Sequence, residues 1–458
     1  MRKNRNLAIA ALIVLISIAV AYALYDRIYL PRKYSALMEK IITGAIAALD
    51  EDRLAGQPIH IAVPGTELTE ETRKAIAAIK PGGIIFFGFN LQDAAQIKKL
   101  TTDLQALAAE LGLPPFLIST DQEGGYVRRV REGVLQTPPA MDMGATGDRE
   151  LCRATGYHVS RDLGALGINV FFAPIVDINN NPQNPVIGLR SFGANLDAVL
   201  GCALPFEQGA RQAMREGGAL PVIKHFPGHG DTQTDSHWAL PVIDKKIDEL
   251  RALELIPFRE AIRDGAQAVM TAHILYPQID PDHPATLSSR WLSGTLRSEL
   301  GFAGLVFTDA MEMNAVSQNF KTLDRPVTAI LAGADVLLYT SWQEEPPEAH
   351  ARLQAAIQSG TLKTGRNAES QPLPLQRALE NQLRQKLALL DIGKYLTPEE
   401  AAWYRKYTQA LQAQKPATPV TLSKDDLTAR FAQIRWSTKK KKGGPIWLAG
   451  QKNSAKAR

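Results

Sequence analysis

The sequence is poor in cysteine and has no strong excess of either charge. Cys152 and Cys202 are the only cysteines in 458 residues. Two cysteines say little about the redox compartment, and buried free thiols are the default expectation. The formal net charge is only +5, and much of it lies at the two ends of the chain. Basic residues are not interleaved with aromatic residues along any groove-like segment, which argues against a nucleic-acid partner.

Long apolar runs are absent from the body of the chain, but one run opens it. Residues from Leu7 to Leu24 carry no charge and follow Arg2, Lys3 and Arg5. A run of this length is at the lower limit for spanning a bilayer, and the small residues around Tyr22 also suit signal cleavage. We expect a membrane anchor or signal segment over residues 1–30, with an uncleaved anchor favoured. A linker helix over residues 31–56 follows.

The body, residues 57–395, alternates short apolar runs with helical patterns. With 45% hydrophobic and 22% charged residues, its composition is typical of a globular protein. Strand–helix alternation predicts a parallel sheet covered by helices, and eight such units fit an α/β fold of the (β/α)8 TIM-type barrel class. The predicted strands are Ile59–Val63, Gly83–Phe87, Phe116–Thr120, Val170–Pro174, Pro221–Ile223, Ala268–Ala272, Leu305–Thr308 and Val336–Tyr339.

Polar residues recur just after these strands. Asp121, Asp177, His225, His273 and Asp309 each follow a predicted strand at or near its carboxyl end. In a barrel of parallel strands, that face holds the active site. One or two such residues would be expected simply because loops are polar, but five indicate a site.

The densest group of titratable residues lies between Lys224 and His237, where prolines and glycines exclude a regular helix. His225 and His229 have a spacing that metal ligands use on helices, although no helix is expected here. A solvated loop without function is a second alternative. The third is an acid/base pair, because Asp235 and His237 point to the same side of an extended chain. A carboxylate on one imidazole nitrogen lets the other nitrogen exchange protons near neutral pH.

Five segments, which occur along the chain in the same order as in the family, resemble glycoside hydrolase family 3, in its β-N-acetylglucosaminidase branch; the most informative is given first. They are Lys224–Gly230 followed by Asp235–His237, Asp121–Gly125 with Arg128 and Arg129, Asn184–Gly193, Pro284–Ser288, and Leu300–Met313. The resemblance runs from about residue 57 to about residue 395. It implies a (β/α)8 barrel and a retaining exo-hydrolase of terminal β-linked N-acetylhexosamine.

The resemblance also implies roles for particular residues. Asp309 would be the nucleophile that forms a covalent glycosyl-enzyme, and His237, oriented by Asp235, would be the acid/base. We expect the loop carrying His237 to swing in when sugar binds. The residues implied in binding sugar hydroxyls and the N-acetyl group are Asp121, Arg129, Arg190, Lys224 and His225. Glu123 would position its basic neighbours. No metal or organic cofactor is implied.

The implied substrate is a β-N-acetylglucosaminide, plausibly a muropeptide-like fragment of peptidoglycan. We therefore expect a catalytic domain on the periplasmic or extracytoplasmic side, anchored or exported. Two alternatives stay open: a β-glucosidase or broad exo-hexosidase on the same scaffold, and an inactive carbohydrate-binding membrane protein. Residues 396–458 are predicted to form a helical and basic tail, partly disordered, with four consecutive lysines at 439–442.

Overall fold

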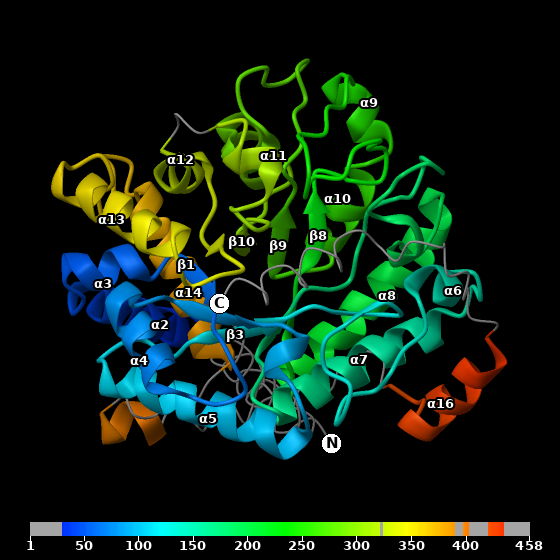
Figure 1. Ribbon diagram of the computed structural model, residues 1–458, viewed down its shortest axis with the longest axis horizontal. Coiled ribbons are helices and arrows are strands. Elements are labelled where there is room, and N and C mark those ends of the chain that lie inside the picture. Colours follow the sequence, from blue (N-terminus) through cyan, green and yellow to red (C-terminus); the bar gives the residue numbers. More distant parts are fainter. Residues whose placement is uncertain (1–29, 321–323, 390–396, 403–419, 435–458) are drawn as a thin grey trace, which may run out of the picture. The chain divides into compact units, whose positions relative to one another are not determined.

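The computed structural model describes residues 30–320, 324–389, 397–402 and 420–434 (Figure 1). The chain divides into one compact unit of residues 1–48 and 391–417 and another of residues 49–390 and 418–458. The predicted anchor run at 7–24 and the lysine run at 439–442 lie outside the described residues. Within the described ranges, no helix is both long and apolar enough to cross a membrane.

In the smaller unit, the described residues are helical. Helix α2 spans Leu30–Ala47, and residues 398–402 form a short helical segment. Lys40 Nζ lies 2.7 Å from Glu400 Oε1, which links two segments far apart in the sequence.

The larger unit is built on two parallel sheets (Figure 1). One has the strand order β11-β1-β2-β3-β6-β7 and the other β10-β9-β8. Single parallel bridges join the sheets at both sides, Ile175 to Lys224 and Phe307 to Val336. The strands are β1 (Ile59–Ala62), β2 (Gly83–Phe86), β3 (Leu117–Thr120), β6 (Val170–Phe171), β7 (Leu220–Pro221), β8 (Ile223–Phe226), β9 (Ala268–Thr271), β10 (Leu305–Phe307) and β11 (Leu337–Leu338). A small antiparallel hairpin, β4 (Gln122–Gly124) and β5 (Val127–Arg128), follows β3.

Most strand positions are apolar because both faces of the sheets are buried, as expected for parallel sheets. The exceptions include His60 on β1, Ser119 on β3 and Lys224 on β8. Side chains within or directly beside the strands form the central core, including Leu117, Phe172, Val222, Met270 and Phe307. The predicted parallel α/β architecture is therefore confirmed, and the strand limits differ from the prediction mostly by one to three residues. The exception is the fifth strand, which continues through β8 to Phe226 and so contains Lys224 and His225.

Helices separate the strands, and polar N-caps start many of them. Side chains of Thr69, Asp93, Asp148 and Asn195 each accept a backbone N–H of the first turn. The helices of this unit are α3 (Glu51–Gly56), α4 (Glu70–Ile79), α5 (Ala94–Glu110), α6 (Ala140–Gly144), α7 (Arg149–Ala165), α8 (Leu196–Arg215), α9 (Ile247–Ala252), α10 (Ile256–Arg263), α11 (Asn314–Ser317), α12 (Arg325–Ala332), α13 (Glu345–Gln358), α14 (Pro374–Leu389) and α16 (Lys424–Gln433), with a π-helix at Arg290–Glu299.

The prediction of one linker helix over residues 31–56 is wrong. Helix α2 ends at Ala47 and α3 begins at Glu51. Asp50 lies between them with an extended backbone, and its side chain accepts the N–H of Arg53. Aspartate competes in this way for backbone N–H groups and favours a new helix start over continuation.

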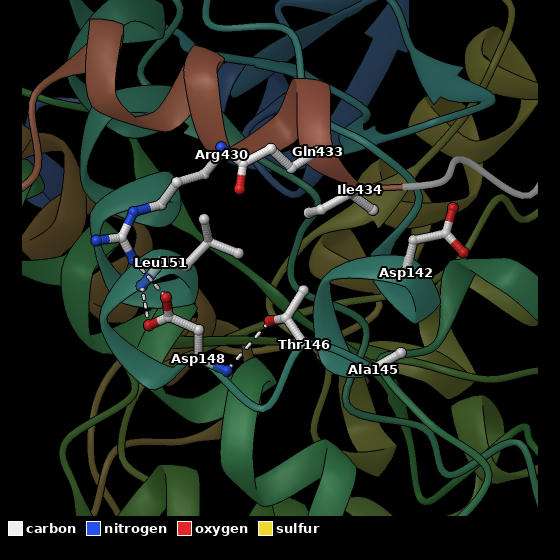
Figure 2. Close-up of a pocket in the computed structure, with 8 residues that line it drawn as sticks. All are labelled: Asp142, Ala145, Thr146, Asp148, Leu151, Arg430, Gln433 and Ile434. Carbon is white, nitrogen blue, oxygen red and sulfur yellow. Dashed lines mark hydrogen bonds and ion pairs between the residues drawn. The ribbon is translucent and has the colours of Figure 1, made fainter.

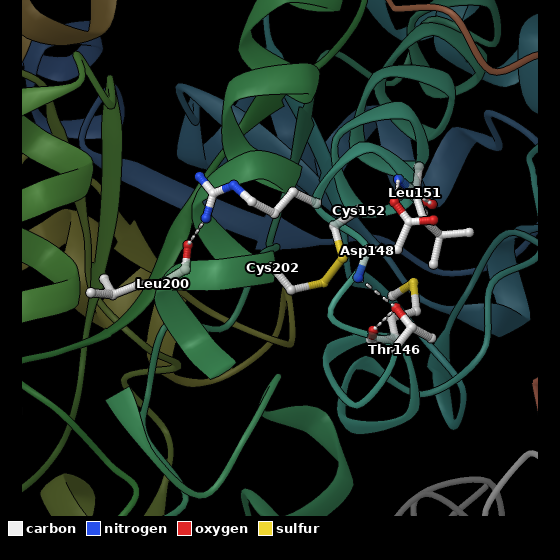
Figure 3. The surroundings of a disulfide bond; sticks show 9 residues. Thr146, Asp148, Leu151, Cys152, Leu200 and Cys202 are labelled. Atoms are coloured by element: carbon white, nitrogen blue, oxygen red, sulfur yellow. Dashed lines mark hydrogen bonds between the residues drawn. A yellow bond between two sulfur atoms is a disulfide. The ribbon is translucent and has the colours of Figure 1, made fainter. Parts of the chain in front are cut away.

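The expectation of free thiols is also wrong, because Cys152 on α7 and Cys202 on α8 form a disulfide (Figure 3). Helices α7 and α8 pack along one another, and the two Cα atoms are 5.3 Å apart. That separation suits a disulfide, whereas a spacing of fifty residues in the sequence says nothing about distance.

Part of the predicted tail packs on the larger unit. Lys424 pairs with Asp162, Arg430 pairs with Asp148, and the carbonyl of Leu422 lies 2.9 Å from His158 Nε2. A hollow of about 540 Å³ lies between α16 and the start of α7 (Figure 2). Its lining residues are Asp142, Ala145, Thr146, Asp148, Leu151, Arg430, Gln433 and Ile434, none of which was predicted as a site residue.

Candidate active site

Asp309 follows β10 at the carboxyl edge of its sheet. Thr308 fixes this strand end, because its N–H donates to Val336 and its hydroxyl oxygen accepts the N–H of Leu338. Asp309 Oδ1 accepts the N–H of Ala310 at 2.8 Å. The carboxylate is therefore held on a rigid strand end, as a reacting group requires.

The surroundings of Asp309 keep it ionised. Burial acts to raise the pKa of Asp309, but the positive potential of His225, His273 and His237 lowers it to about 2. His273 is itself fixed, with Nε2 at 2.9 Å from the carbonyl oxygen of Ala310 and Nδ1 at 2.9 Å from Thr286 Oγ1. An ionised carboxylate is the form that can attack an electrophilic carbon.

A buried network of charges joins the ends of neighbouring strands. Lys224 Nζ on β8 lies 2.9 Å from Asp121 Oδ1 and 2.6 Å from Glu123 Oε1. Arg190 binds both oxygens of Glu123 at 2.8 Å, and Arg129 approaches Asp121 at 3.7 Å. The expected role of Glu123 is seen directly, because it holds Lys224 and Arg190 in place.

Glu123 and its partner Arg190 both stay charged. Burial acts to raise the pKa of Glu123, but Arg190 and Lys224 hold it far below the usual range. Burial acts to lower the pKa of Arg190, but Glu123, Asp121 and Asp309 raise it. Donors that are charged and fixed give strong, directional hydrogen bonds to sugar oxygens.

Asp177 is a buried residue whose importance the sequence indicated only by its place after a strand. Its carboxylate accepts the N–H groups of His225 and His229, and its Oδ2 lies 2.7 Å from His225 Nδ1. By binding Nδ1, the carboxylate of Asp177 fixes the orientation and the tautomer of the His225 imidazole. Only the folded chain reveals this, because Asp177 lies 48 residues before His225.

The histidine spacing that suggested a metal has another explanation. His229 Nδ1 lies 2.9 Å from Thr232 Oγ1, and Nε2 lies 3.1 Å from Ser236 Oγ. Both ring nitrogens are thus engaged by hydroxyl groups. Burial lowers the pKa of His229 to about 4, so the ring is neutral at physiological pH.

Asp235 and His237 form the predicted pair. Asp235 Oδ1 lies 2.7 Å from His237 Nδ1 and also accepts the backbone N–H of His237 at 2.9 Å. The side chain of His237 is 41% exposed and that of Asp235 only 17%, so the imidazole is available while its partner is held. The pair belongs to a loop, as expected from its glycines and threonines.

The loop lies on the same side of the sheets as Asp309. The carbonyl of Ser236 accepts the N–H of Ala315, six residues beyond Asp309, at 3.3 Å. His237 also contributes to the low pKa of Asp309. The fold therefore brings His237 and Asp309 to the same edge of the sheets, although the two residues lie 72 residues apart in the sequence.

Residues 52–371 match the Glycosyl hydrolase family 3 N terminal domain. The chain belongs to glycosyl hydrolase family 3. It is 37% identical over 311 residues to a β-hexosaminidase of Methylobacillus flagellatus, covering 67% of this chain and 86% of that protein. A β-hexosaminidase of Nitrosomonas eutropha is 34% identical over 322 residues, with 68% and 90% covered.

Solved structures of the family have the same fold. A glycoside hydrolase family 3 β-N-acetylglucosaminidase from Paenibacillus sp. superposes with a TM-score of 0.69 and 40% identity, covering 79% of this chain and 68% of that one. NagZ from Neisseria gonorrhoeae, solved with N-trifluoroacetyl-D-glucosamine, gives a TM-score of 0.61 and 29% identity, with 83% and 98% covered. The resemblance first found in five short motifs thus extends over most of the chain.

Proposed function

We propose that this family 3 protein is a retaining exo-β-N-acetylglucosaminidase. The observation that carries the proposal is the place of Asp309 at the end of β10, on the same side of the sheets as the hydrogen-bonded pair Asp235–His237. The neighbouring histidines lower the pKa of Asp309, in keeping with a carboxylate nucleophile. The names of its relatives support the sugar, because they are β-hexosaminidases and β-N-acetylglucosaminidases. We infer that the two curled parallel sheets together form one closed (β/α)8 barrel, because single β-bridges join them at both sides.

In the proposed mechanism, Asp309 attacks the anomeric carbon while His237 protonates the leaving oxygen. Two groups acting from opposite sides of the bond give a covalent glycosyl-enzyme, which water then hydrolyses with retention. Asp235 holds His237 Nδ1, which leaves Nε2 to give the proton and later to take one from water. The partial exposure of His237 fits a loop that closes over bound sugar.

The charged network would bind the sugar. Asp121 accepts from hydroxyl groups, and Arg129, Arg190 and Lys224 donate to oxygens of the ring substituents and the N-acetyl group. His225, fixed by Asp177, offers its remaining nitrogen to the same sugar. Because these groups already neutralise one another, they are in place before the substrate arrives.

We further propose that the enzyme works outside the cytoplasm on peptidoglycan fragments. Two features support this location: the apolar run at 7–24 and the Cys152–Cys202 disulfide, since disulfides persist in oxidising compartments. Whether that run anchors the chain in the membrane is part of the same proposal. A β-linked N-acetylglucosamine unit of the wall would be the natural substrate.

Hydrolysis assays with Asp309→Asn test the function. The wild type should release N-acetylglucosamine from its para-nitrophenyl β-glycoside, with kcat reduced at least ~1,000-fold in the variant because the carboxylate nucleophile is gone. Faster hydrolysis of the matching glucoside would favour the β-glucosidase alternative. No hydrolysis of either by a folded wild type would favour the carbohydrate-binding alternative.

A further inference from the structure

A second group of charges lies at the start of the loop that carries Asp235 and His237. Lys245 Nζ lies 2.7 Å from Asp231 Oδ2 and 2.7 Å from Glu254 Oε1. Burial acts to lower the pKa of Lys245, but the two carboxylates raise it, so the ammonium is charged at neutral pH. Asp231 belongs to the loop, whereas Glu254 lies between α9 and α10.

Glu254 belongs to the rigid body. Its side chain is buried, and Asn180 Nδ2 donates to its Oε1 at 3.0 Å. Gly228 packs against it so closely that a Cβ on Gly228 would lie 2.9 Å from the Cβ of Glu254. The hydroxyl of Tyr276 donates to the carbonyl of Gly228 at 2.9 Å. The chain leaving β8 is therefore fixed at residue 228, and Asn184 Nδ2 also donates to the carbonyl groups of His229 and Gly230.

The far end of the loop is also held. Ser236 Oγ contacts His229 Nε2, and its carbonyl accepts from Ala315. Between these ends, residues 232–235 contain no regular structure. Lys245 ties Asp231 to the buried Glu254, and the next residue, Thr232, is held by Asn184 and His229 through its hydroxyl group. Beyond Thr232 the loop turns towards His237.

We propose that Lys245 is a positioning residue for the acid/base, holding Asp231 against Glu254 so that His237 is delivered to the glycosidic oxygen. Without the ammonium, two carboxylates that share one partner would face each other at close range and repel. The start of the loop would then move away from the barrel and take Asp235 and His237 with it. The inference rests on the proposed function.

Substrates with different leaving groups test this role. A good leaving group such as para-nitrophenolate needs little protonation, whereas the sugar leaving group of N,N′-diacetylchitobiose needs the acid. In Lys245→Met we expect kcat/KM to fall about 30-fold or more for the disaccharide and no more than about threefold for the aryl glycoside, since small misplacements of reacting groups have effects of this size. Lys245→Arg should recover most of the loss.

The adjacent, exposed Lys246 gives the matched control, and Lys246→Met should leave both substrates within about twofold. Equal losses on both substrates in Lys245→Met would show a merely structural role and overturn the proposal. Unchanged rates on both would overturn it as well.

Hydrogen exchange separates this inference from the proposed function. Amides of residues 231–237 should exchange at least about fivefold faster in Lys245→Met than in Lys246→Met, because the loop start is released. If the wild type hydrolyses neither substrate, the proposed function fails, and this measurement still decides whether Lys245 holds the loop. Equal exchange in the two variants would refute the positioning role.

Discussion

Lys386 carries a buried amino group whose hydrogen-bond partner among the described residues, Gln57, is neutral. It lies on α14, is only 2% exposed, and donates to Gln57 Oε1 at 3.1 Å. Burial lowers the pKa of Lys386 from 10.5 to about 7. A fall of this size corresponds to roughly 4–5 kcal/mol of unfavourable free energy for the charged form, since each pKa unit is ~1.4 kcal/mol.

Replacing Lys386 by Met should stabilise the protein at neutral pH. The substitution keeps an unbranched side chain and removes the desolvated charge. It leaves Gln57 Oε1 without this donor, which costs about 1–2 kcal/mol. The expected net gain in the free energy of unfolding is about 2 kcal/mol at pH 7, seen as a rise in Tm of about 4 °C.

The sign of the pH dependence gives a sharper test. Between pH 7 and 10.5 the unfolded chain binds a proton at Lys386 that the folded chain has lost, so wild-type stability rises with pH across this window. Below pH 7 both states are charged and the contribution is constant. The advantage of Lys386→Met should therefore shrink by about 1.4 kcal/mol per pH unit above pH 7 and reverse near pH 8.5. Near pH 10 mainly the effect of the lost hydrogen bond remains.

Urea unfolding at pH 6, 7, 8.5 and 10 measures this difference, with the exposed Lys74→Met on α4 as control. The control should differ from the wild type by less than about 0.5 kcal/mol at every pH. A Lys386→Met protein that is less stable than the wild type at pH 7, or whose difference does not change with pH, would refute the reasoning.

Two other predictions concern the acid/base pair and the disulfide. Asp235→Asn should lower kcat/KM for N,N′-diacetylchitobiose about 1,000-fold, because an amide cannot hold the His237 tautomer as the carboxylate does; a loss below about tenfold would contradict the proposed role of Asp235. Replacing both Cys152 and Cys202 by Ala should lower the free energy of unfolding by about 2–4 kcal/mol, because the bridge closes a fifty-residue loop. Thermal unfolding with and without dithiothreitol checks this, since the reductant should lower Tm in the wild type and leave the variant unchanged.

Local patterns in the sequence determined the order and type of the elements. The strands are fully buried, so each appears as a short apolar run between helical segments, and its place is visible without any tertiary contact. Asp121, His225, His273 and Asp309 were found as candidates because each follows such a run. The pairing of Asp235 with His237 was also predictable from the sequence alone, because residues two positions apart on an extended segment lie close together and point to the same side.

Tertiary structure alone decided which distant groups meet. The Cys152–Cys202 bridge depends on how α7 packs against α8, and the contact of Asp177 with His225 depends on the approach of two strand ends. Lys245 joins Asp231 to Glu254 only because the segment that carries Glu254 packs against Gly228, at the end of β8. Hydrophobic periodicity in the sequence does not predict such contacts, because the distance between two residues in a folded chain is set by packing and not by their separation in the sequence.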